Sequence, residues 1–108
     1  MKTPYIIVFV TVPDRKTANK IKNIVLENKI AACVSVTGGV SSFYWWKGKI
    51  GRAKEYLLVM KTVKAKFSDL EKRVKKVHPY EVPEIIAADI SAGSKDYLDW
   101  IKKYACGK

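Results

Sequence analysis

Two segments of this chain are apolar on both faces of an extended strand, and this feature constrains the fold most. Residues 5–10 read Tyr-Ile-Ile-Val-Phe-Val, and residues 56–60 read Tyr-Leu-Leu-Val-Met, so both alternating sets of side chains are apolar. Such runs are typical of strands that are buried on both faces. A sheet that contains them therefore needs a covering layer on each side.

Helical periodicity predicts three helices. Lysine residues separate the apolar positions of residues 16–28, which is typical of an amphipathic helix that Asp14 caps. A second helix follows from apolar residues at spacings of four and three, with Thr62 as its cap and Pro79 as its end. This stripe comprises Val63, Phe67, Leu70, Val74 and Val77. A last helix begins after Ser94, and its expected inward-facing residues are Tyr97, Leu98, Ile101 and Tyr104.

The remaining strands come from extended, β-branched or aromatic runs. Residues 31–36 predict a strand, Gly38-Gly39 interrupts the pattern, and residues 40–46 resume it. Lys47-Gly48-Lys49 is expected at the tip of a long hairpin whose second arm runs to Thr62. Residues 85–90 predict the final strand.

The resulting order, β-α-β-β-α-β-α, predicts a single α+β domain over residues 1–108. Its first six elements form the split βαβ, or ferredoxin-like, arrangement. Right-handed crossovers place the first two helices on one face of a four-stranded antiparallel sheet. Because large exposed apolar faces are rare on soluble monomers, we expect the second face to pack against another subunit.

Composition excludes several classes of protein. No segment approaches the roughly 20 apolar residues of a membrane span, and the N-terminal run lacks a cleavage pattern. Two cysteines, Cys33 and Cys106, do not make a disulfide framework, so we expect a cytoplasmic protein. The net charge of +11 favours an anionic partner, although scattered helical lysines also serve simply as a solvated face.

The stretch His78-Pro79-Tyr80-Glu81-Val82-Pro83-Glu84-Ile85 combines an imidazole, a phenol, two carboxylates and two prolines. With Ala31-Ala32-Cys33-Val34 and Tyr44-Trp45-Trp46-Lys47-Gly48-Lys49-Ile50, it resembles the CutA family of divalent-cation-tolerance proteins. Glu55, Lys61-Thr62 and Tyr97-Leu98-Asp99-Trp100 extend the resemblance over nearly the whole chain.

This resemblance implies a ferredoxin-like subunit in a compact homotrimer like that of the PII signalling proteins. It also implies a role in tolerance or response to divalent cations, particularly copper, and no enzymatic reaction. The chain departs from the family at Ser35, where asparagine is common. It departs again at Val10, where copper-implicated members carry cysteine. The high positive charge is a further departure.

Candidate metal ligands are few. Thiolate and imidazole suit copper or zinc, yet tight sites use three or four ligands. We therefore expect no required cofactor and at most a weakly bound Cu(II) or other divalent cation, centred on an exposed His78. Cys33 is expected to serve as a small hydrophobe. The candidate metal residues are His78, Cys33, Glu81 and Glu84.

Polar groups in apolar strands suggest a cleft between subunits. It would hold a divalent cation or a small anionic ligand, although an ion pair of Glu55 and Lys61 across the trimer interface would also satisfy these groups. The candidate cleft residues are Trp46, Glu55, Lys61, His78, Tyr80 and Glu84. Aromatic residues are enriched at interfaces, and the expected trimer contacts are Tyr44, Trp45, Trp46, Tyr97 and Trp100.

Other functions stay open. The run Phe43-Tyr44-Trp45-Trp46-Lys47 suits a module that binds single-stranded RNA, but residues 56–61 lack the usual aromatic-glycine pattern of such modules. A structural or signalling trimer that binds a protein partner is the other alternative. No nucleophile-base spacing, phosphate-binding glycine loop or paired-carboxylate motif supports an enzyme.

Overall fold

Four antiparallel strands form the frame of the protein in the order β2-β3-β1-β4. The computed structural model describes residues 4–105. The strands are β1 (Tyr5–Val12), β2 (Cys33–Trp46), β3 (Lys49–Val63) and β4 (Ile85–Asp89). Strands β2 and β3 form a hairpin, whereas β1 pairs with β3 and β4, which are distant from it in sequence, so the predicted ferredoxin-like arrangement is confirmed.

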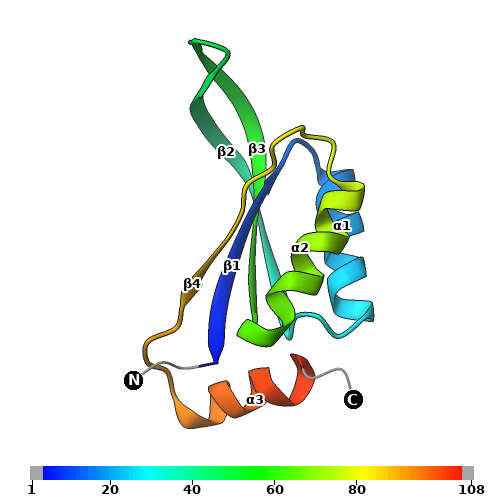
Figure 1. The fold of residues 1–108 in the computed structure, drawn as a ribbon, viewed down its shortest axis with the longest axis vertical. Coiled ribbons are helices and arrows are strands. Elements are labelled where there is room, and N and C mark those ends of the chain that lie inside the picture. Colours follow the sequence, from blue (N-terminus) through cyan, green and yellow to red (C-terminus); the bar gives the residue numbers. More distant parts are fainter. Residues whose placement is uncertain (1–3, 106–108) are drawn as a thin grey trace.

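Helices α1 (Arg15–Glu27) and α2 (Phe67–Val77) lie side by side against one face of this sheet (Figure 1). The predicted cap of α1 is confirmed, because the Asp14 carboxylate accepts a hydrogen bond from the Thr17 backbone N–H at 2.8 Å. This hydrogen bond holds the pKa of Asp14 below its ordinary value. No helix within residues 4–105 is long and apolar enough to cross a membrane.

The start of α2 differs from the sequence prediction. Strand β3 continues through Val63, a 3-10 turn (Lys64–Lys66) follows, and α2 begins only at Phe67. Thr62 is not a helix cap. Its hydroxyl is fully buried and donates to the Ile30 carbonyl oxygen at 2.5 Å. The predicted boundary was wrong because an apolar residue such as Val63 fits the end of a strand as well as the start of a helical stripe.

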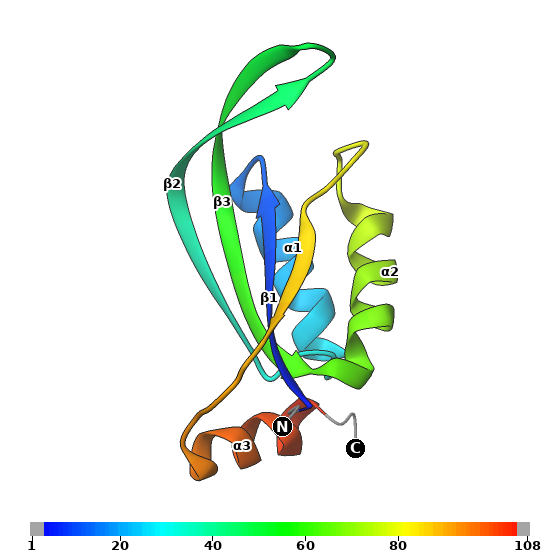
Figure 2. The ribbon, with the colours of Figure 1, turned by 60° about the vertical axis from the view of Figure 1, so that its left-hand side comes forward.

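Helix α3 (Lys95–Ala105) crosses the end of the sheet opposite the hairpin tip (Figures 1 and 2). The predicted Ser94 cap is confirmed by a 3.3 Å hydrogen bond from the Tyr97 N–H to the Ser94 hydroxyl. Ile101 is buried as expected, and with Ala105 it packs against the end of β3. Tyr97 and Tyr104, in contrast, are 43% and 45% exposed, so their predicted inward orientation is wrong for a single subunit.

The hairpin of β2 and β3 is long and extends beyond the rest of the sheet. Strand β1 ends where Val12 pairs with Tyr56, whereas β2 and β3 continue to pair up to Trp46 and Lys49. Figure 2 shows this extension reaching above the upper ends of β1, α1 and α2 and bending over at its tip. We call residues 40–55 the arm. The predicted tip is confirmed, and Gly48 adopts a left-handed φ of 78° there.

The two faces of the sheet are covered unequally. On the helix side, Val8, Val10, Leu58 and Met60 are fully buried. On the opposite side, the alternating residues Phe9, Leu57 and Val59 are only partly buried, and Ile86 is 54% exposed. We call this second surface the open face.

Candidate functional site

His78 joins the end of α2 to the sheet. The ring is only 8% exposed, its Nε2 lies 2.7 Å from the Thr11 carbonyl oxygen, and its Nδ1 lies 3.2 Å from the Tyr80 backbone nitrogen. The tautomer protonated at Nε2 satisfies both contacts, because Nε2–H donates to Thr11 while Nδ1 accepts from Tyr80. The exposed imidazole predicted from the sequence is wrong, because His78 is buried. Neither ring nitrogen offers a free lone pair to a metal.

The turn after His78 carries Tyr80 across to the hairpin. The Tyr80 hydroxyl donates to Glu55 Oε2 at 2.6 Å, a short hydrogen bond to a carboxylate that is itself only 6% exposed. Burial and this hydrogen bond both raise the pKa of Tyr80 well above its ordinary value. The phenol therefore stays protonated and holds the carboxylate in place.

A hollow of about 750 Å³ opens beside the Glu55–Tyr80 pair. It lies between the arm and the turn that follows α2. We call it the arm pocket, and its lining residues are Thr11, Ser42, Phe43, Tyr44, Trp45, Trp46, Glu55, Pro79, Tyr80, Glu81, Val82 and Glu84. Of the six cleft residues predicted from the sequence, the pocket brings together Trp46, Glu55, Tyr80 and Glu84.

A register shift in β2 decides which arm residues share the face of Glu55. Thr37 pairs with Leu57 and Val40 pairs with Glu55, so β2 advances three residues while β3 advances two. Because paired residues point to the same face, the extra residue puts Tyr44 and Trp46 on the side of Glu55. Both rings remain 43% exposed. Phe43 and Trp45 border the pocket more loosely and are 68% and 73% exposed.

Lys61 and Cys33 lie elsewhere. Lys61 is six residues from Glu55 along β3, a separation of about 20 Å in an extended strand, so the two do not form an ion pair within one subunit. Cys33 pairs with Lys61 across the sheet, and its Sγ lies 3.7 Å from the Tyr97 hydroxyl. That contact raises the pKa of Tyr97, and burial adds to the effect. The thiol is half-buried.

The metal candidates do not converge. His78 and Cys33 sit at opposite ends of the sheet, and only Glu81 and Glu84 share the arm pocket with Glu55. Within residues 4–105, no group of three or more His, Cys, Asp or Glu side chains is arranged to hold a metal ion. Cys106 lies outside the described residues.

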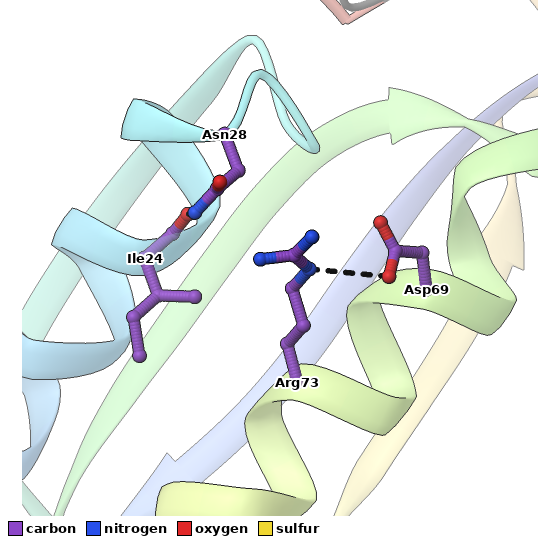
Figure 3. Close-up of polar contacts among 4 residues, drawn as sticks. All are labelled: Ile24, Asn28, Asp69 and Arg73. Atoms are coloured by element: carbon purple, nitrogen blue, oxygen red, sulfur yellow. Dashed lines mark hydrogen bonds and ion pairs between the residues drawn. The ribbon is translucent and has the colours of Figure 1, made fainter.

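A second, smaller hollow of about 390 Å³ lies between α1 and α2 and has the opposite charge. Lys72, Arg73 and Lys76 line it with Asn28 and one carboxylate, Asp69. Arg73 Nε lies 3.1 Å from Asp69, whereas the Asn28 amide donates to the Ile24 carbonyl and closes the end of α1 (Figure 3). Its cations are spread over an open surface, which is typical of a solvated helix face.

Sequence reasoning missed several parts of the arm pocket. The pairing of Glu55 with Tyr80 joins residues 25 positions apart, although each was a candidate alone. Thr11 was missed because its contribution to His78 is a backbone carbonyl, which no side-chain pattern reveals. Gly38-Gly39 was the available signal for the register shift.

Sequence comparison identifies similar proteins. The family model described as CutA1 divalent ion tolerance protein matches residues 6–104. The divalent-cation tolerance protein CutA of Thermus thermophilus is 41% identical over 97 residues, which cover 90% of this chain and 94% of that protein. The chloroplastic protein CutA of Arabidopsis thaliana is 42% identical over 99 residues, which cover 92% of this chain and 54% of the plant protein.

Solved structures agree with the sequence matches. The divalent cation tolerance protein of Thermus thermophilus superposes with a TM-score of 0.91 at 40% identity, covering 93% of this chain and 97% of the other. CutA1 of Oryza sativa gives a TM-score of 0.92 at 37% identity, covering 99% and 98%. The similarity therefore extends over the arm and all three helices.

Proposed function

The chain belongs to the CutA1 family of divalent ion tolerance proteins, and from this membership we propose that it acts as a homotrimer in the response to divalent cations, copper in particular. The proposal includes no catalytic step. Its functional unit is a cleft between subunits that contains the arm pocket and binds a small ligand, with metal held only weakly.

The open face is the observation that carries the trimer. Phe9, Leu57 and Val59 form a continuous apolar surface on neighbouring strands, and no element in residues 4–105 covers them. Tyr44 and Trp46, which lie on the same face of the hairpin as Leu57 and Val59, add to this surface and are each 43% exposed. Apolar surface of this extent favours burial against further copies of the chain.

Light scattering on the purified chain tests this arrangement. The expected mass is three times the 12.2 kDa of one subunit. A stable monomer at low micromolar concentration would rule out both the trimer and a cleft between subunits.

Metal binding is proposed to be weak and to rest on the Glu81 and Glu84 carboxylates, because His78 has both ring nitrogens engaged. Two exposed carboxylates make an open site with few protein ligands. A copper titration by calorimetry compares the wild type with Glu81→Gln/Glu84→Gln, with Cys33→Ser as the matched control. We expect the double substitution to remove most binding and Cys33→Ser to leave it unchanged. Loss of binding in Cys33→Ser would instead place copper at the thiol.

A further inference from the structure

We propose that the arm pocket binds an organic cation, namely an ammonium or guanidinium group carried on an apolar body. This inference rests on the ligand-binding role proposed above and specifies its chemistry.

The charge of the arm pocket is opposite to that of the protein. The chain carries a net charge of +11, yet three carboxylates and no Lys, Arg or His are found among the described residues that line the pocket. These carboxylates are Glu55, Glu81 and Glu84. Negative charge concentrated in one concave site attracts cations and repels anions. The small anionic ligand expected from the sequence is therefore a poor match for this pocket.

Glu55 is the strongest anchor in the pocket. Its side chain is more than nine-tenths buried, and Oε2 already accepts from the Tyr80 hydroxyl. Within residues 4–105 no buried side-chain oxygen lacks a hydrogen-bond partner, so Oε1, which accepts no hydrogen bond from these residues, stays in contact with solvent in the pocket. A buried carboxylate is costly unless it is fully hydrogen-bonded or paired with a positive charge. A ligand that brings an N–H donor and a positive charge to Oε1 would replace its contact with solvent by a charge-assisted hydrogen bond.

The aromatic rings determine what else the ligand must carry. Tyr44 and Trp46 share the face of Glu55, and Phe43 and Trp45 complete an apolar rim. Rings placed around a carboxylate favour a cation through their negative faces, and they bury its hydrocarbon portion. The Nζ of Lys47, the next residue in the chain, lies 6.0 Å from the centroid of the Trp46 ring. A small, strongly hydrated ion would leave this apolar rim unused.

Calorimetry with three probes of matched shape tests the proposal. The probes are 2-phenylethylammonium, 2-phenylethanol and 3-phenylpropionate, which carry a positive, a neutral and a negative head on the same phenyl body. We expect the ammonium to bind at least tenfold more tightly than the alcohol, and the carboxylate not to bind. Fluorescence of a Trp100→Phe variant, which retains only Trp45 and Trp46, should change with the same affinity.

Glu55→Gln provides the decisive variant, because glutamine preserves the shape and still accepts from the Tyr80 hydroxyl. We expect it to weaken ammonium binding at least tenfold and to leave alcohol binding unchanged. Glu27→Gln, which removes one exposed carboxylate outside the pocket, is the control and should bind like the wild type. If Glu55→Gln fails to fold, Glu81→Gln on the exposed turn replaces it, with a loss of severalfold expected.

The mass of each sample is measured alongside binding. Equal or tighter binding of the alcohol or the carboxylate overturns the cationic specificity. A trimer that binds none of the probes overturns the pocket proposal. The next candidate occupant of the arm pocket is then a side chain of a neighbouring subunit. A monomer that still binds the ammonium contradicts the trimer alone and supports the pocket chemistry.

Discussion

The two faces of the sheet have similar apolar residues but different surroundings. On the helix side, α1 and α2 bury Val8, Val10, Leu58 and Met60 completely. On the open face, residues directly adjacent in the same strands, such as Phe9 and Val59, keep part of their surface in contact with water. Since strand residues alternate, the same short segments of chain supply both surfaces.

This difference separates folding from assembly. Covered positions are satisfied within one chain, so substitutions there should change the stability of the subunit itself. Positions on the open face remain unsatisfied in a single chain, so substitutions there should mainly change association. Neighbouring residues of one strand thus allow the two effects to be measured separately.

The largest expected effect comes from introducing a charge at two adjacent positions of β3. Leu58→Asp places a carboxylate in a fully buried position and should prevent folding, because a buried unpaired charge costs several kcal/mol. Val59→Asp places the same charge on the open face and should leave a folded subunit of monomeric mass. Circular dichroism and light scattering distinguish the outcomes. A Val59→Asp protein that still assembles would show that the open face is not the association surface.

A polar group on the covered face provides the next test. Thr62→Val keeps the size of the side chain but leaves the Ile30 carbonyl without its donor, so unfolding free energy should fall by about 1–3 kcal/mol. Urea denaturation measures this loss, while the oligomeric mass should not change. Ser35→Val, at an exposed position of β2, is the control and should have little effect on subunit stability. Equal effects of the two substitutions would contradict the assignment of Thr62 to the core.

Fold and site were predictable to different degrees from the sequence. The order of helices and strands follows from local periodicity, and two of the three helix caps follow from capping chemistry; both act over a few residues. The sheet topology then follows from the order of the elements. The state of His78 does not, because its partner is a backbone carbonyl 67 positions away. Tyr97 was expected to be buried because its spacing fits an apolar helical stripe. The spacing of such a stripe is the same whether it packs in the core of the subunit or is exposed on its surface.

The N-cap of α1 lies outside both faces of the sheet. A substitution there serves as a reference for a change in helix stability that involves neither face. Asp14→Ala removes the hydrogen bond to the Thr17 N–H and should lower the unfolding free energy without affecting association. Asp14→Asn, which keeps an acceptor, should restore most of the loss. Because the hydrogen bond holds the pKa of Asp14 down, this stabilisation should be present above the ordinary carboxyl pKa and be lost as the pH falls below it. An equally large loss in Asp14→Asn would argue against the cap.

The smallest expected effect concerns Tyr80, at the border of the open face. Tyr80→Phe should cost about 1 kcal/mol at neutral pH, because the Glu55 carboxylate loses its hydroxyl donor. The folded state raises the pKa of this phenol, so its contribution is complete below the ordinary tyrosine value of 10.0 and declines as the pH rises above it. The stability difference between wild type and Tyr80→Phe should therefore be constant from pH 7 to about 10 and shrink at higher pH. A difference that grows above pH 10 would contradict this.

The extra residue near Gly38-Gly39 has a consequence for how such a gene can change. Loss of one codon here would restore an uninterrupted pairing of β2 with β3 and turn every later residue of β2 to the other side. Phe43 and Trp45 would then exchange places with Tyr44 and Trp46, although none of the four has mutated. The binding surface of the arm is thus encoded in the length of a short segment as much as in the identity of its residues. Insertion and deletion, and not only substitution, are the means by which descendants of this chain could acquire a different ligand.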